Sequence, residues 1–283
     1  MRKALLTAIL ACSFLITEAQ VKTPQASPAA KVEQTVGLTE VHIEYSRPSA
    51  KGRTVYGDLV PFGKNWRTGA NANTTVSFTT DVTISGKTLK KGTYALFTTP
   101  KADSWDIIFY TDTNNWGLPQ NWDESKVALK ASIKPETLSK AVETFTIEVN
   151  NLTNDGASLD LAWERTRVSL PFSVPTQNMA MASIEKALAG PSMGDYFSAA
   201  QYYYQSNQDL TKALSWVNSA ISMTPSGEDT PFWYLRLKSL IQAKLGDKKG
   251  AIETAKKSLA GAQKAGNADY EKMNKDSIAE WSK

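Results

Sequence analysis

Hydrophobic and polar positions alternate along most of the first part of the chain. Val41, Ile43 and Tyr45 alternate with polar neighbours, and similar short runs recur at 76–78, 82–84, 93–99, 105–110, 127–133, 145–149, 159–163 and 168–174. A period of two is typical of strands with one face in a core. About nine short strands without intervening amphipathic helices predict an antiparallel β-sandwich or jelly-roll-like domain over residues 31–175, with a turn at Glu164-Arg165.

The pattern changes after Pro175. Residues 176–283 are rich in Ala, Leu, Lys and Gln, and apolar positions recur at helical spacing in six segments: 179–189, 195–206, 210–223, 232–245, 248–265 and 268–281. Residues 199–221 align with 237–259 at a constant offset of 38, matching Asp209 with Asp247 and Ala213 with Ala251. This arrangement resembles tetratricopeptide repeats. It predicts an α-helical, helical-hairpin domain that offers a groove to a protein partner.

One segment of the β region, residues 47–75, follows neither period. It is long for a connection inside a compact domain, and long ordered loops usually carry function. It contains the basic, aromatic and amide side chains that we predict as a ligand-binding surface: Arg47, Lys51, Arg53, Trp66, Arg67 and Asn71. Guanidinium groups bind carboxylate, sulfate or phosphate through several donors, and an indole adds a stacking face. An anionic glycan or peptide is the expected ligand.

The same arginines can instead hold the loop together. Arginine donates readily to backbone carbonyls and to carboxylates such as Asp58 and Glu44, and Gly57, Gly63 and Gly69 fit turns that need unusual dihedral angles. The residues alone leave both interpretations open.

The N-terminus has the features of a secretory signal peptide. Residues 1–19 combine Arg2 and Lys3 with a short apolar run and a small residue, Ala19, at the expected cleavage site. Residues 20–30, rich in Pro, Ala and Ser, are expected to form a flexible leader. The predicted location is therefore periplasmic or secreted, and a lipoprotein attached through Cys12 is the less favoured alternative. No apolar run is long enough to span a bilayer.

Composition excludes several classes of function. With 32 basic and 28 acidic residues the net charge is +4, too small to indicate nucleic-acid binding. His42 is the only histidine, and Cys12 is the only cysteine and lies in the signal peptide, so a His- or Cys-based metal site is not expected. Neither a nucleophile elbow nor a phosphate-binding glycine motif is present. We therefore predict no cofactor, no metal and no catalytic residue.

Three neighbouring tryptophans support one enzymatic alternative. Trp105, Trp116 and Trp122 lie close in sequence to four carboxylates, Asp106, Asp112, Asp123 and Glu124. A glycan hydrolase uses two carboxylates at a fixed separation, but nothing in the sequence fixes the separation of these four.

The run YSRPSAKGRTVYGDLVPFGKNWRTGANANTT, followed by GKTLKKGTYALFTTP and WDIIFY, resembles a family of exported bacterial proteins common in the Bacteroidetes and known as domain of unknown function 2911. The resemblance covers residues 31–174. It implies an exported β domain in a Gram-negative envelope, often with a tetratricopeptide-like tail, and implies no activity. The leading hypothesis is a non-enzymatic binding protein of the envelope. The alternatives are a glycan hydrolase and a purely architectural protein that bridges others.

Overall fold

The computed structural model describes residues 23–283. It divides into two compact units that meet between Pro175 and Thr176, an antiparallel β unit followed by a helical unit. The predicted signal peptide and Cys12 lie outside the described residues.

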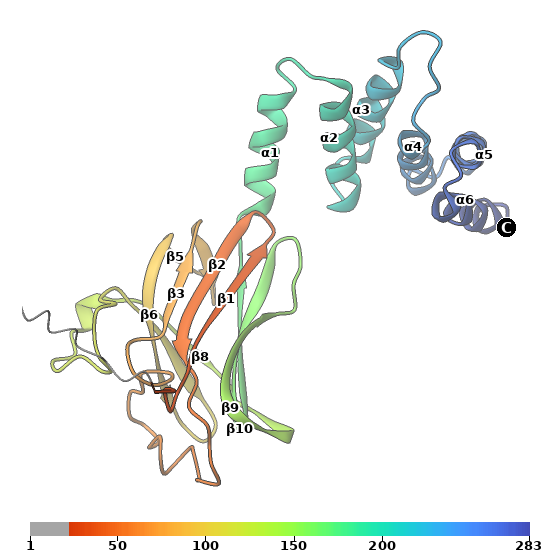
Figure 1. Cartoon of the computed structure of the whole chain (residues 1–283). Coiled ribbons are helices and arrows are strands. Elements are labelled where there is room, and N and C mark those ends of the chain that lie inside the picture. The colour runs from red at the N-terminus through yellow and green to blue at the C-terminus, as the bar shows by residue number, and fades with distance from the viewer. Residues whose placement is uncertain (1–22) are drawn as a thin grey trace, which may run out of the picture. The chain divides into compact units, whose positions relative to one another are not determined.

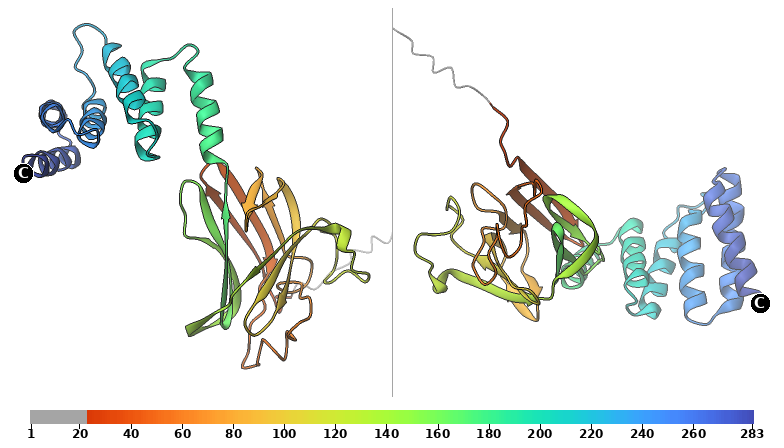
Figure 2. Two further views of the ribbon diagram at one scale, coloured as in Figure 1. Left: turned by 180° about the vertical axis from the view of Figure 1, so that it is seen from behind. Right: turned by 90° about the horizontal axis from the view of Figure 1, so that it is seen from below.

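The β unit consists of two antiparallel sheets (Figure 1). The first sheet has the strand order β1 (Ala29–Val36), β2 (Thr39–Ser46), β3 (Thr75–Phe78), β6 (Gly92–Pro100), β7 (Trp105–Tyr110) and β8 (Val127–Ile133). The second has the order β5 (Lys87–Leu89), β4 (Val82–Ile84), β10 (Gly156–Ser173) and β9 (Glu136–Asn150). Figure 2 shows the same sheets from behind and from below.

The two sheets bury one shared hydrophobic core. In β2 the alternation seen in the sequence is realised: Val41, Ile43 and Tyr45 are buried, whereas the residues between them are more exposed. Trp105 in β7 and Trp163 in β10 are among the largest fully buried side chains and belong to the same core. Burial of apolar surface at about 25 cal/mol per Å² is the main stabilising term of such a sandwich.

Two details differ from the sequence prediction. β1 begins at Ala29, inside the segment expected to be a flexible leader, because Ala29 and Ala30 pair with the end of β2. The predicted turn at Glu164-Arg165 is wrong: β10 runs through it as one strand. Its pairing with β9 shifts on both sides of Glu164, whose φ of 53° accommodates the irregularity. A β-bulge therefore takes the place of a turn.

The helical unit contains six helices: α1 (Thr176–Ala187), α2 (Met193–Gln205), α3 (Leu210–Ser222), α4 (Phe232–Lys244), α5 (Lys248–Lys264) and α6 (Ala268–Trp281). α2 packs on α3, and α4 packs on α5. Residues that align in the sequence have the same structural role in both helix pairs. Asp209 and Asp247 cap the N-termini of α3 and α5, and Ala213 and Ala251 are fully buried. A small residue at these positions lets the paired helices approach closely. The likeness to tetratricopeptide repeats remains a prediction.

Among residues 23–283, none of the helices combines the length and the apolar character that a membrane crossing requires. Within the same residues, no group of three or more His, Cys, Asp or Glu side chains is arranged to bind a metal ion.

Candidate functional site

The long loop between β2 and β3 is ordered against the sandwich at one end of the strands (Figure 1). It contains no regular strand, and isolated contacts fix it instead. Trp66 and Thr98 of β6 exchange two backbone hydrogen bonds, of 2.7 and 3.0 Å. Ser49 forms a bridge with Thr144 of β9, and their hydroxyl oxygens lie 3.0 Å apart. The loop is therefore attached to both sheets.

Arg47 contributes to this attachment rather than to an open surface. Its Nε donates to the carbonyl oxygen of Phe145 at 2.9 Å, and its Nη2 donates to Thr146 Oγ1 at 2.6 Å. Two of its donors are thus directed at β9, and Arg47 does not line the pocket described next.

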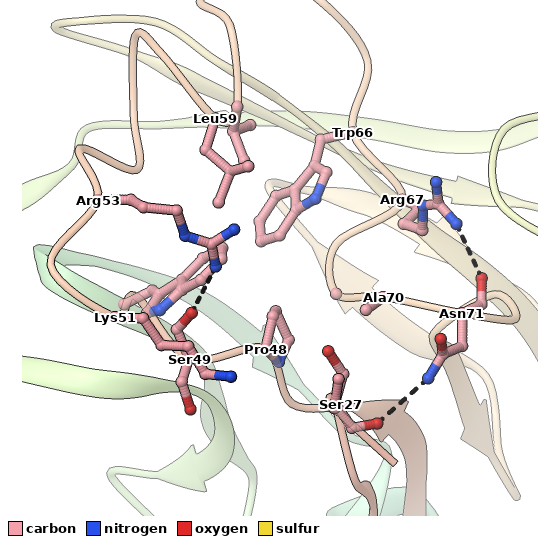
Figure 3. Close-up of a pocket in the computed structure, with 14 residues that line it drawn as sticks. Ser27, Pro48, Ser49, Lys51, Arg53, Leu59, Trp66, Arg67, Ala70 and Asn71 are labelled. Atoms are coloured by element: carbon pink, nitrogen blue, oxygen red, sulfur yellow. Dashed lines mark hydrogen bonds between the residues drawn. The ribbon is translucent and has the colours of Figure 1, made fainter.

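The loop surrounds a pocket of about 460 Å³. Five of the six predicted binding residues line it: Lys51, Arg53, Trp66, Arg67 and Asn71 (Figure 3). None of the described residues that line the pocket is an aspartate or a glutamate. The volume lies in the range of small-molecule sites, and the described lining carries three cations without an opposing charge.

The three cations keep donors available. Lys51 is exposed, and its Nζ has no partner among residues 23–283. Arg53 donates from Nε to Ala50 O at 2.9 Å and from Nη2 to Ser49 O at 2.7 Å, which leaves Nη1 free within the described chain. None of the three forms an ion pair with a described carboxylate. Two carboxylates from the second sheet accept from backbone amides of the loop instead: Glu143 from the amide of Lys51, and Glu164 from the amide of Val55.

Arg67 and Asn71 form the opposite side of the pocket (Figure 3). Arg67 Nη1 donates to Asn71 O at 3.1 Å. The amide nitrogen of Asn71 donates to Ser27 O and to Ser46 Oγ, both at 3.2 Å, which leaves its Oδ1 as a free acceptor within the described chain. Each pocket arginine therefore supports the loop by donating to its carbonyl oxygens and retains other N–H groups without a partner in the described chain. That these remaining groups bind a ligand stays a prediction.

Aromatic side chains form the wall of the pocket. Trp66 stacks on Trp163 with ring centroids 5.8 Å apart and planes inclined by 19°. Trp163 is held by a hydrogen bond from its Nε1 to Glu143 O. Tyr56 contacts Trp66 edge to face, and burial, reinforced by the nearby Glu164 carboxylate, raises the pKa of Tyr56, so the phenol stays neutral. A rigid, uncharged aromatic cluster thus lies beside the cations.

Gly69 allows the loop to turn beside the pocket. Its φ of 141° is a conformation that essentially requires glycine. A Cβ atom there would lie 2.9 Å from Ser46 O and 3.1 Å from Thr74 Oγ1. The close approach of Gly69 to Ser46 therefore leaves no room for a side chain.

The carboxylates of the enzymatic alternative are engaged in local structure. Asp106 is buried and accepts from Ser132 Oγ, Lys101 Nζ and Lys130 Nζ at 2.6, 3.3 and 3.1 Å. The other three have these partners: Asp112 with Lys126, Asp123 with the amide of Ser125, and Glu124 with the indole N–H of Trp122. None of the four lines the pocket at the loop.

Sequence reasoning missed two parts of the site. Trp163 was expected only as a core residue of a strand, and no sequence signal shows that Trp66 stacks on it. Ser27 was placed in the flexible leader, yet it lines the pocket and accepts a hydrogen bond from Asn71. The start of β1 at Ala29 brings Ser27 there.

No curated protein and no solved structure matches the chain. The model of one family, described as protein of unknown function (DUF2911), matches residues 27–172. This range contains the pocket loop and nearly all of the β unit, and it exceeds half of the 283 residues. The chain therefore belongs to the DUF2911 family.

Proposed function

We propose that this chain is an exported binding protein that captures an anionic ligand in the pocket of the β2–β3 loop. The observation that carries the proposal is the combination of Lys51, Arg53 and Arg67 around one pocket that has no carboxylate among its described lining residues. A cluster of like charges raises the free energy of the empty site, and an anion relieves that repulsion. The ligand group is a carboxylate, sulfate or phosphate.

The aromatic wall adds a requirement on the rest of the ligand. Trp66, backed by Trp163, offers a flat apolar surface beside the cations. Sugar rings and planar groups bind such surfaces through their C–H or π faces. A ligand with an acidic group next to a flat ring satisfies both features. Hydrogen bonds to charged groups contribute about 1.5–3 kcal/mol each when sheltered, and less at an exposed lysine.

Calorimetric titration of the purified chain tests the proposal. The probes are galacturonate, galactose 6-sulfate and neutral galactose, which share a ring and differ in charge. We expect the two anionic sugars to bind and galactose to bind at least tenfold more weakly, with affinities that fall as salt is added. Equal binding of all three, or binding of none, would refute the proposal.

Lys51 provides a variant with a matched control. Lys51→Met removes a pocket charge that has no partner in the described chain, and about 1 kcal/mol of lost ion pairing corresponds to about fivefold weaker binding. Lys64→Met removes the same charge from an exposed position of the same loop that does not line the pocket. It should leave affinity unchanged. Equal effects of the two variants would show that only net charge matters.

Export is part of the proposal and has its own test. It is supported by the sequence pattern of residues 1–19. Mass spectrometry of the protein from fractionated bacteria should show a mature N-terminus at Gln20 in the periplasm or the medium. An intact Met1 in the cytoplasm would contradict export, and a lipid-modified Cys12 would establish the lipoprotein alternative.

The helical unit is proposed to hold a protein partner. Support comes from a groove of about 720 Å³ lined by Met181 of α1, by Leu188 directly after that helix and by Trp216 of α3. A photocrosslinker at Met181 should give a discrete adduct in cells, whereas one at the exposed Lys256 should not. The same adducts from both positions would contradict a specific role for the groove.

A further inference from the structure

The connection between β7 and β8 carries an exposed indole. Trp116, in the connection between β7 and β8, is 76 % exposed, more than any other large hydrophobic side chain of the described residues. Tryptophan is usually largely buried, because transfer of its apolar surface out of water is favourable. The buried aromatic residues of this unit follow that rule, and Trp116 departs from it.

The backbone on both sides of Trp116 is fixed by one buried side chain. Asn73, which is 7 % exposed, donates from Nδ2 to Gly117 O at 2.7 Å and accepts at Oδ1 from the amide of Asn115 at 3.2 Å. The amide of Asn73 also donates to Asn115 O at 3.2 Å. Three hydrogen bonds therefore hold the residues before and after Trp116 against the pocket loop. The exposed indole is carried by an anchored backbone, not by a free loop tip.

Arg67 connects this indole to the pocket. It lines the pocket, and its guanidinium carbon also lies 3.0 Å from the position that a Cβ atom on Gly117 would occupy. The guanidinium thus packs against the backbone immediately after Trp116. With φ of 98°, Gly117 leaves the space that the guanidinium fills. One cation is shared by the pocket and the Trp116 segment.

We propose that the ligand of the pocket is an acidic oligosaccharide rather than a single sugar. One sugar residue occupies the pocket beside Trp66, and a neighbouring residue of the same chain stacks on Trp116, with Arg67 between them. This inference rests on the proposed function and narrows its ligand to one class. Exposed, pre-positioned aromatic faces suit sugar rings, because each ring of the chain repeats an apolar C–H face.

The polar atoms left open in the pocket favour a sugar over an acidic peptide. Asn71 Oδ1 and Ser27 Oγ have no partner within the described chain, and both residues line the pocket. A hydroxyl group can donate to either oxygen while it accepts from a neighbouring arginine. A glutamate side chain supplies acceptors alone. A sugar acid therefore satisfies this lining more completely than a carboxylate side chain does.

Titration of the full chain with galacturonate and with tetragalacturonate tests the inference. We expect the tetramer to bind the unaltered protein at least tenfold more tightly than the monomer. Trp116→Ala should remove about five- to tenfold of the tetramer's affinity and leave the monomer's affinity unchanged. Trp116→Phe should retain part of the gain. Because the side chain is exposed, the melting temperature should stay the same in both variants.

The outcomes separate this inference from the function on which it rests. Tight binding of the monomer with no gain for the tetramer, or no effect of Trp116→Ala on the tetramer, would refute the oligosaccharide and leave the anion site standing. A tetraglutamate peptide that binds more tightly than tetragalacturonate would replace the glycan with a peptide. Failure of every anionic probe to bind would overturn the proposed function itself.

Discussion

Arg47 Nε donates a 2.9 Å hydrogen bond to the carbonyl oxygen of Phe145, which lies 98 residues further along the chain. This bond joins the first residue after β2 to β9, a strand of the other sheet. The basic residues of this loop therefore have two different roles, one structural and one at the pocket. Arg47 fastens the loop to the sandwich, and Lys51, Arg53 and Arg67 face the pocket.

Replacement of Arg47 should cost stability. Arg47→Met keeps the apolar stem and removes both donors to β9, so we expect the free energy of unfolding to fall by about 1.5–3 kcal/mol. Lys51→Met, which removes a charge without a described partner, should change it by less than about 0.5 kcal/mol. Chemical denaturation of the two variants measures the difference. Equal losses would contradict the division of tasks.

Gly69 gives a second prediction with an internal control. Gly69→Ala places a methyl group 2.9 Å from Ser46 O in a strained backbone conformation, and should cost about 1–3 kcal/mol. Gly63→Ala has a positive φ of 74° but open space around the added atom, and should cost about 1 kcal/mol. Thermal melts compare the two. A smaller loss at Gly69 than at Gly63 would show that the loop relaxes freely.

Much of the fold could be predicted from local pattern. The alternation at Val41, Ile43 and Tyr45 fixed both the strand and its buried face, because the side-chain period of a strand is two. The spacing around Asp209 and Asp247 likewise indicated two similar helix pairs. The continuity of β10 could not be read locally, since Glu164 and Arg165 resemble a turn, and the bulge arises from pairing with β9.

The site was predictable in composition but not in geometry. The basic and aromatic residues of the loop led to the prediction of a binding surface, and five of the six predicted side chains line one pocket. Ligand binding at this pocket remains a proposal. Which arginine serves as an anchor depends on contacts with Phe145 and Thr146, about a hundred residues away, that no local signal reveals. The same holds for Trp163 behind Trp66. Contacts between residues far apart in the sequence, and not residue type, decide which side chain anchors the loop and which lines the pocket.

Asp106 should make the stability of the β unit depend on pH. Burial alone would raise its pKa, but hydrogen bonds from Ser132, Lys130 and Lys101 outweigh burial and hold the pKa below its ordinary value of 3.8. A lowered pKa in the folded state adds stability that is present above pH 3.8 and is lost as the pH falls through the folded-state pKa. The two lysines are half exposed, so solvent weakens their contribution.

Asp106→Asn should therefore lower stability by about 1–2 kcal/mol at pH 7, and the difference from the unaltered protein should shrink below pH 3.8. Urea denaturation at pH 7 and at pH 3 measures both values. A difference that stays constant over this range would mean that the carboxylate charge has no part in the effect.

The two helix pairs predict equal sensitivity at equivalent buried positions. Ala213→Met and Ala251→Met each place a larger side chain where no surface is exposed, and overpacking of this kind costs about 1–3 kcal/mol. Asn218→Met on the exposed face of α3 should change stability by less than about 0.5 kcal/mol. Thermal melts of the full chain compare the three. A neutral effect at one alanine alone would show that the pairs are not structurally equivalent.

The central claim is that an anionic ligand binds in the pocket of the β2–β3 loop, and the most direct test is to find where on the protein such a ligand binds. The chain contains eight tryptophans, so protein labelled with ¹⁵N at tryptophan gives a small set of indole N–H signals, which single Trp→Phe variants assign. Titration with galacturonate should shift the Trp66 signal in a saturable way and leave that of Trp281, in the helical unit, unchanged. If the indole signal of Trp66 stays unshifted up to saturating galacturonate, the proposed binding site is contradicted.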